Sequence, residues 1–168
     1  MQRNILEYLE QTAPRFPDKT AFANDKTGMT FQEVYDASRK IGTCLAKKGY
    51  AKEPVVIYMK KHPHMITAFW GVVYSGCFYV PMDEEMPEYR IGLIFDNLHP
   101  RAVICDDFTA GKVKEMAEFD GEVLMYDEIS AGVRSTRTRS TSSSPPAPPG
   151  YRRAWWDATG RSSIMWRV

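Results

Sequence analysis

The sequence predicts a three-layer α/β domain with a mainly parallel sheet flanked by helices, followed by a disordered tail. Three observations support this fold class. Residues 55–58 are continuously apolar, as is typical of a strand buried on both faces of a parallel sheet. Around Gly76 and Pro87, a helix ends, a short strand-forming run follows, and a new helix begins. Segments with helical and strand periodicity alternate as far as residue 133.

A short amphipathic helix is expected at the N-terminus. Asn4 and Glu7 have the spacing of an N-cap and its N3 partner, ahead of apolar residues at helical spacing. Pro14 ends this helix. Residues 19–23 then form a strand that leads into turn residues 24–28.

A long helix and a buried strand come next. Thr30 and Glu33 form a second capping box, and Gly49 ends the helix behind two lysines. Residues 54–59 form the buried strand. Residues 63–75 form a helix with a wide apolar face, which should lie between that strand and the next.

The alternation continues after Gly76. Residues 78–80 are strand formers, and Pro81 is expected to end this strand because it has no N–H for the ladder. The remaining elements are predicted as a helix over 89–98, a strand over 102–105, a helix over 108–119 and a strand over 123–126.

Composition gives no overall indication of several classes of partner. The formal net charge of +1 gives no reason to expect nucleic acid or an anionic membrane as a partner. Cys44, Cys77 and Cys105 are odd in number and far apart, which favours core packing in a reducing compartment over a disulfide framework. The sequence has neither a secretory h-region nor an apolar run of about 20 residues. We therefore expect a cytoplasmic protein.

Polar residues between the elements are the candidate site residues. His62 and His64 flank a proline like half a metal site, but no cysteine or acid stands near them at ligand spacing, so they are interpreted as exposed residues at a helix start. Asp83, Glu84 and Glu85 have the chemistry of a cation site or of paired acids. They are interpreted instead as a solvated turn ahead of a helix N-terminus.

The other basic residues receive structural interpretations. His99 precedes a proline in a loop without an evident partner. The pairs 47–48 and 60–61 are lysines at solvated ends of elements and do not form a phosphate cradle. No nucleophile–base pair and no glycine-rich loop precedes the tail, so no catalytic residue, cofactor-binding residue or metal ligand is predicted.

Two motifs in this order resemble the adenylate-forming enzymes, and the resemblance covers residues 4–128. Residues 29–34, MTFQEV, are similar to the first core of amino-acid adenylation domains of nonribosomal peptide synthetases and of D-alanyl carrier-protein ligases. The GxxYVPxD and PxxRI pattern of the second core is matched by Gly76, Tyr79, Val80, Pro81, Asp83, Pro87, Arg90 and Ile91.

The resemblance implies an activity and a set of partners. A full-length relative would use ATP and Mg²⁺ to activate an amino acid or other carboxylic acid as an acyl-adenylate. It would pass the acyl group to a phosphopantetheine thiol of a carrier protein or to CoA. The resemblance also implies a phosphate-binding loop of the form TSGSTGxPKG, which belongs at Ser144 to Ala154, and further parts of the adenylation domain that are missing after it.

The tail, residues 134–168, contains neither the phosphate-binding loop nor the later parts of the adenylation domain that the resemblance implies. It is rich in Ser, Pro and Arg and has no apolar period, which predicts disorder. Reading codons across the printed codon boundaries at 144–154 permits F-T-S-G-S-T-G-V-P-K-G. We therefore hypothesise that a single-base frameshift just ahead of Thr136, in the gene or in its assembly, has removed the phosphate loop.

Residues 1–133 would accordingly be a partial N-terminal subdomain without adenylation activity. Two alternatives stay open. The chain is a non-catalytic binding or regulatory module on the same scaffold, or it binds RNA through its basic tail. If the chain is a fragment, it should expose surface meant for the rest of the enzyme, for example through Trp70 or Met82.

Overall fold

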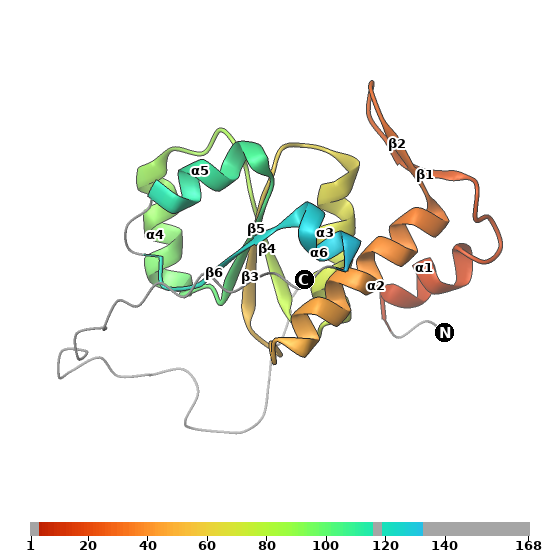
Figure 1. The fold of residues 1–168 in the computed structure, drawn as a ribbon, viewed down its shortest axis with the longest axis horizontal. Helices are drawn as coiled ribbons and strands as arrows, with labels where there is room; N and C mark the ends of the chain where they lie inside the picture. The colour runs from red at the N-terminus through yellow and green to blue at the C-terminus, as the bar shows by residue number, and fades with distance from the viewer. Residues whose placement is uncertain (1–3, 116–118, 133–168) are drawn as a thin grey trace, which may run out of the picture. The chain divides into compact units, whose positions relative to one another are not determined.

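The computed structural model describes residues 4–115 and 119–132, and its helices and strands alternate as the sequence predicts (Figure 1). In chain order the elements are α1 (Leu6–Thr12), β1 (Thr20–Ala23), β2 (Gly28–Thr30), α2 (Phe31–Lys47), β3 (Pro54–Tyr58), α3 (Pro63–Tyr74), β4 (Phe78–Met82), α4 (Glu88–Leu98), β5 (Ala102–Cys105), α5 (Asp107–Glu115), β6 (Glu122–Met125) and α6 (Tyr126–Ala131). The tail, and with it the predictions made for residues 134–168, lies outside the described residues.

The main sheet is parallel throughout, with strand order β4-β3-β5-β6. Helices cover both of its faces, α2, α3 and α6 on one and α4 and α5 on the other (Figure 1). Alternate residues of β3 point to the two faces, so Val55 and Ile57 join the core beneath α2 and α3, whereas Val56 and Tyr58 join the core beneath α4. The predicted three-layer α/β fold is confirmed.

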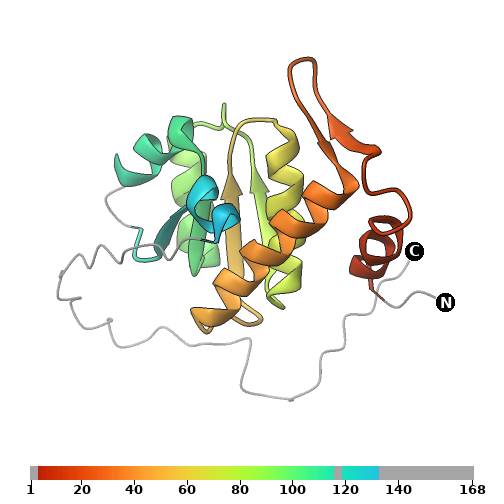
Figure 2. The same cartoon turned by 45° about the vertical axis from the view of Figure 1, so that its right-hand side comes forward.

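Helices α2 and α3 lie close together because glycines line their contact (Figure 2). A Cβ placed on Gly71 would stand 2.5 Å from Cγ2 of Ile41, and one on Gly42 would stand 2.5 Å from Cβ of Tyr74. Only glycine fits at these two positions without a shift of a helix. α3 therefore packs on α2 as well as on the sheet, beyond the predicted place between two strands.

Strand β4 runs through Pro81, so the prediction that this proline ends the strand is wrong. The Phe78 N–H donates to the Glu53 carbonyl of the segment that leads into β3, at 3.2 Å. Backbone N–H and C=O groups alternate in direction along a strand. Those of Phe78, Val80 and Met82 therefore point toward β3, whereas those of Tyr79 and Pro81 point away from it. The missing N–H of Pro81 therefore costs no hydrogen bond with β3.

The predicted helix boundaries hold with two corrections. The Thr30–Glu33 capping box is present at α2, and Gly49 and Gly76 follow their helices with φ of +79°. At α1 the N-cap residue is Ile5, which makes no side-chain cap, and the Asn4 side chain accepts from the Leu6 N–H at 3.1 Å in place of the predicted box.

Helix α4 begins at Glu88, one residue before the predicted start, and Pro87 is its N-cap residue. The predicted helix over 108–119 begins at Asp107 and is described as far as Glu115.

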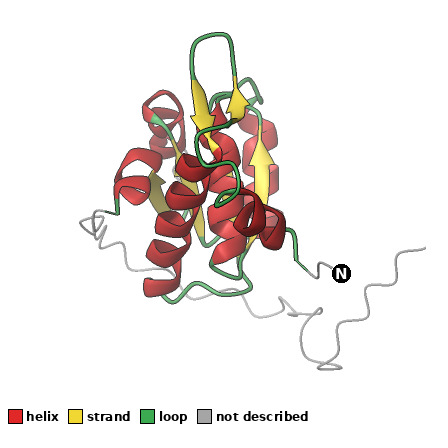
Figure 3. Ribbon diagram, turned by 90° about the vertical axis from the view of Figure 1, so that its right-hand side faces the viewer, coloured by secondary structure: helices red, strands yellow, loops and turns green. Residues whose placement is uncertain are grey.

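The sequence did not predict β2 or α6. β1 and β2 form a separate antiparallel hairpin that projects beyond the helices (Figure 3). Thr27 in its turn contacts His62 at the start of α3, with 2.8 Å between Oγ1 and Nε2. Within the described residues, no helix is both long enough and apolar enough to cross a membrane.

Candidate functional site

The carboxyl end of the parallel sheet is the place where an α/β fold is expected to bind ligands. β4 lies on one side of β3 and β5 lies on the other. The order in which strands are added to the sheet therefore reverses between β3 and β5, although all four strands are parallel. We call a group of residues that follow the strands at this end, or lie in α5, the carboxyl-edge cluster. Its members are Lys60, Lys61, Asp83, Glu84, Asp106, Phe108 and Lys112.

Asp106 is the centre of this cluster. Its Oδ1 accepts from the N–H groups of Phe108 and Thr109 at 3.1 and 2.9 Å, which caps the start of α5, and its Oδ2 accepts from the Lys60 N–H at 2.9 Å. Burial alone would raise the pKa of Asp106, but these hydrogen bonds outweigh it and hold the pKa below its ordinary value. Asp106 is not among the candidate residues predicted from the sequence, although it is the first polar residue after β5.

The acidic turn after β4 is held by lysines. Lys61 donates its N–H to Oε2 of Glu84 at 2.9 Å, and its Nζ lies 3.0 Å from Oδ2 of Asp83. Lys112 Nζ donates to the Glu84 carbonyl at 3.0 Å. The Glu85 N–H, followed by Lys61, lowers the pKa of Asp83. The prediction of a solvated turn is correct for Glu85, which is exposed. Asp83 and Glu84 are half-buried, and both contact Lys61, which follows β3.

An aromatic ring lies between two of these lysines. The Phe108 side chain is 51% exposed, with Lys60 Nζ at 3.7 Å and Lys112 Nζ at 5.3 Å from the ring centroid. Both ammonium groups can interact with the electron-rich face of the ring. The sequence predicted Lys60 only as a solvated end of an element. Phe108 and Lys112 were not predicted as site residues, because the contacts of Phe108 with Lys112 and with Lys60 depend on how α5 packs on the sheet.

The two histidines have structural contacts. His62 is the N-cap of α3, and its Nδ1 accepts from the His64 N–H at 3.2 Å while its Nε2 lies against Thr27. The His64 ring stacks on Tyr126, with centroids 4.7 Å apart, and burial lowers the pKa of His64. Among the described residues, no group of three or more His, Cys, Asp and Glu side chains could hold a metal ion.

Lys48 lies with four other polar residues at the opposite end of the sheet. We call Lys48, Tyr50, Glu53, Arg101 and Glu122 the amino-edge cluster. Lys48 Nζ lies 2.5 Å from Oε1 of Glu122, so the prediction that it is a solvated helix end is wrong. The Tyr50 hydroxyl donates to the other carboxylate oxygen of Glu122, and Arg101 Nε lies 3.4 Å from Oε2 of Glu53.

Protonation in the amino-edge cluster follows from these contacts. Burial and then the hydrogen bond to Glu122 raise the pKa of Tyr50. Burial also acts to raise the pKa of Glu122, but Lys48 and Tyr50 outweigh it and lower that pKa. His99 lies outside the cluster, where its left-handed backbone (φ 46°) ends α4.

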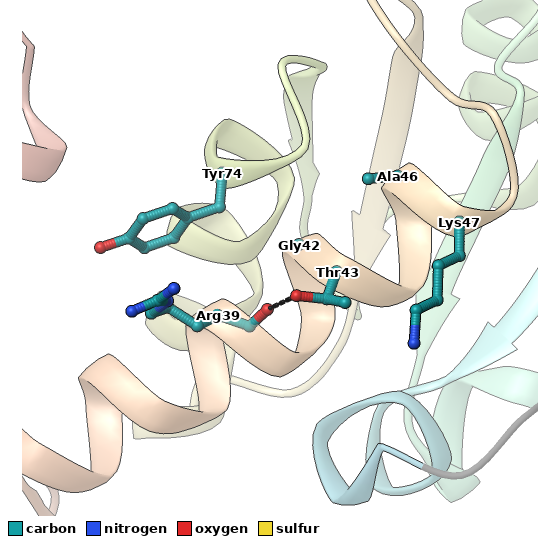
Figure 4. Close-up of a pocket in the computed structure, with 6 residues that line it drawn as sticks. All are labelled: Arg39, Gly42, Thr43, Ala46, Lys47 and Tyr74. Atoms are coloured by element: carbon teal, nitrogen blue, oxygen red, sulfur yellow. Dashed lines mark hydrogen bonds between the residues drawn. The ribbon is translucent and has the colours of Figure 1, made fainter.

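A hollow of about 450 Å³ lies on the outer side of α2 and α3 (Figure 4). Its lining residues are Arg39, Gly42, Thr43, Ala46, Lys47 and Tyr74. Tyr35 binds the Arg39 guanidinium at 2.8 Å, the Thr43 hydroxyl donates to the Arg39 carbonyl at 2.8 Å, and the Tyr74 hydroxyl donates to Glu10 at 3.2 Å. The Arg39 guanidinium and the Thr43 and Tyr74 hydroxyls of the hollow are therefore engaged locally, and its lining residues form no nucleophile–base pair.

At the carboxyl end of the sheet, the described carboxylates are bonded to the protein's own groups. The carboxylates of Asp83, Glu84 and Asp106 already bind backbone N–H groups or a lysine. The segment expected to hold the phosphates, residues 144–154, lies outside the described residues. The contacts described above fix the loops at the two ends of the sheet.

Comparison with known proteins identifies the family. Residues 9–155 match the model of the AMP-binding enzymes. The chain belongs to this family. As an AMP-binding enzyme chain, it is 30% identical to tyrocidine synthase 3 of Brevibacillus parabrevis over 76% of its length, and 28% identical to the D-alanine–D-alanyl carrier protein ligase of Staphylococcus aureus over 75%. It spans only 2% and 24%, respectively, of the lengths of these relatives.

Solved structures agree on the fold. The N-terminal subdomain of NpsA from Klebsiella oxytoca, in complex with 3-hydroxyanthranilyl-AMSN, aligns with a TM-score of 0.63 at 21% identity, over 86% of this chain and 34% of that one. VinN aligns with a TM-score of 0.68 at 21% identity, over 82% of this chain and 39% of that one. The AMP-binding family chain described here therefore shares its fold with about a third of the length of each of these structures.

Proposed function

We propose that this chain supplies the N-terminal α/β part of an ATP-dependent ligase that activates an amino acid or other carboxylic acid as an acyl-adenylate. The acyl group would then pass to a phosphopantetheine thiol of a carrier protein or to CoA. The observation that carries the proposal is the family match over residues 9–155. Relatives named as a D-alanine–carrier protein ligase and as peptide synthases support it.

We further propose that the chain with the printed tail has no adenylation activity. Backbone N–H groups are what a phosphate-binding loop offers to the nucleotide. The printed sequence has prolines at 145, 146, 148 and 149, and each of them lacks that donor. Among the described residues, Asp106, Glu84 and His62 already accept hydrogen bonds from backbone N–H groups.

We propose that the protein is cytoplasmic. Cys44, Cys77 and Cys105 are all free, and the last two are buried. Three free cysteines are typical of proteins from a reducing compartment. This placement agrees with the use of ATP as a substrate.

ATP–pyrophosphate exchange with the twenty amino acids, together with resequencing of the gene from codon 130 onward, tests the function. The printed chain should give no exchange above the background without enzyme. The longer product of the frame that restores F-T-S-G-S-T-G-V-P-K-G should exchange pyrophosphate with at least one carboxylic acid. Exchange by the printed chain, or DNA that cannot encode the loop, would contradict the proposal.

A further inference from the structure

The outer edge of β4 is an exposed apolar strip. Within the described residues, no strand pairs with this side of β4. Phe78 is 49% exposed on the face covered by α4, and Tyr79 is 41% exposed on the face covered by α3, where it stacks on Phe69 with ring centroids 4.6 Å apart. Met82 is buried, so the prediction that it contributes to exposed surface is wrong. Edge strands usually carry charges that prevent pairing, and β4 has none.

Only one backbone donor of the strip faces outward. Phe78, Val80 and Met82 point their backbone groups toward β3, as the Phe78 N–H to Glu53 carbonyl bond shows. Pro81 faces outward but has no N–H. The Cys77 N–H already donates to the Val72 carbonyl at the end of α3, at 3.2 Å. Tyr79 is therefore left with both an outward N–H and an outward carbonyl.

This pattern is self-complementary. In an antiparallel hydrogen-bonded pair, two opposed residues exchange both of their N–H···O bonds. If a two-fold axis passes between the Tyr79 residues of two copies, these residues form such a pair. Pro81 of one copy then lies opposite Cys77 of the other, where neither residue has a free N–H. Every outward donor of β4 would be satisfied.

The side chains and charges agree with this register. Phe78 of one copy comes opposite Val80 of the other on the α4 face, and the two Tyr79 rings become neighbours on the α3 face. Lys52 is attached to Gly76 through its N–H, at 3.0 Å from the Gly76 carbonyl, so it would approach the acidic turn at Asp83 of the other copy. The net charge of +1 adds little repulsion between copies.

We propose that the chain forms a two-fold symmetric dimer in which the β4 strands pair antiparallel about Tyr79, joining two four-stranded sheets into one. The occupant of the strip is thus a second copy of this chain. An isologous contact of this kind is closed, because each edge is used once. The two hydrogen bonds and small apolar contact of this strip predict a weak and reversible dimer.

Sedimentation equilibrium of the full chain tests the dimer. The mass should rise with concentration from that of one 19.2-kDa chain to twice that value and stop there. Tyr79→Pro removes the outward donor without disturbing the β3 ladder, as Pro81 already shows, and should weaken association about thirtyfold. Tyr79→Val keeps the donor and should associate more tightly than Tyr79→Pro.

Two further variants keep the test decisive if Tyr79→Pro fails to fold. Phe78→Lys places a charge in the strip and should weaken association about tenfold. Tyr89→Lys places the same charge on the outer face of α4, where the side chain is 78% exposed, and should leave association unchanged. Circular dichroism establishes that each variant is folded.

Three results would overturn the proposal. They are a monomer at every concentration, a dimer that neither Tyr79→Pro nor Phe78→Lys weakens, and assembly that continues beyond two copies. Hydrogen exchange identifies another occupant. A slowly exchanging Tyr79 amide in a monomer would mean that residues of the same chain cover the strip, which also contradicts a β4–β4 dimer.

Discussion

The two ends of the parallel sheet both carry charged residues, but they bond in different ways. In the amino-edge cluster, side chains bind side chains, as Lys48 and Tyr50 do with Glu122. In the carboxyl-edge cluster, side chains bind mainly backbone groups, as Asp106 does with the N–H groups of Lys60 and Thr109. The amino end therefore fixes helices and strands to one another, whereas the carboxyl end fixes the shape of loops.

This difference bears on where the family chemistry takes place. Ligands of α/β folds bind at the carboxyl ends of the strands, where loops can vary without disturbing the sheet. In this chain the carboxylates of those loops bind the loops' own backbone groups. Lys60 and Phe108 are the members of the carboxyl-edge cluster whose side chains make no hydrogen bond there, and they contact each other. If the proposed function is correct, the phosphate-binding residues come from outside residues 4–115 and 119–132.

The largest effect is expected at the amino end. Glu122→Ala leaves the Lys48 ammonium and the Tyr50 hydroxyl half-buried without their acceptor. We expect the free energy of unfolding to fall by about 2–3 kcal/mol, measured by urea denaturation. Glu122→Gln is the matched control, since it retains an acceptor for Tyr50 and should lose less. Equal losses for the two variants would show that the charge alone matters.

Asp106→Ala should have the next largest effect. It removes the cap of α5 and the bond to the Lys60 N–H, so the free energy of unfolding should fall by about 1–2 kcal/mol. Asp106→Asn retains a capping oxygen and should recover most of the loss. A loss from Asp106→Ala that exceeds that from Glu122→Ala would reverse the ranking of the two ends.

Acidification should weaken both ends, but less than deletion does. The pKa values of Glu122 and Asp106 are lowered in the folded protein, so their contribution is fully present above the ordinary carboxyl pKa of about 4 and is lost as the pH falls through the lowered values. A protonated carboxyl group still accepts hydrogen bonds, which limits the loss. Unfolding measured from pH 7 to pH 2 should therefore show a flatter acid limb in Glu122→Gln than in the parent chain.

The smallest effect is expected for the ion pair on the acidic turn. The Lys61 side chain is exposed and the Asp83 side chain is half-buried at 43% exposure, so water and salt still screen their attraction. Asp83→Asn also keeps the acceptor for the Glu85 N–H. Thermal unfolding should show no measurable change in Tm at 0.15 M salt. A clear decrease would mean that the turn after β4 is held as firmly as the amino end.

The local pattern of the sequence determined where most elements begin and end. The Thr30–Glu33 box and Gly49 bound α2, Gly76 follows α3, and the apolar run of β3 indicated a parallel sheet, all as observed. These features depend on neighbouring residues, whose backbone preferences and spacing are visible in the sequence. The family motifs were likewise visible, because they are contiguous.

Only the tertiary structure decided which distant residues meet. The strand order allows β4 to continue through Pro81, because the outward side of an edge strand needs no N–H. The meeting of Lys48 with Glu122, and of Lys60 with Asp106 and Phe108, follows from how helices dock on the sheet. Such contacts join residues far apart in the chain, and local preferences carry no information about them because packing of the whole core sets their positions.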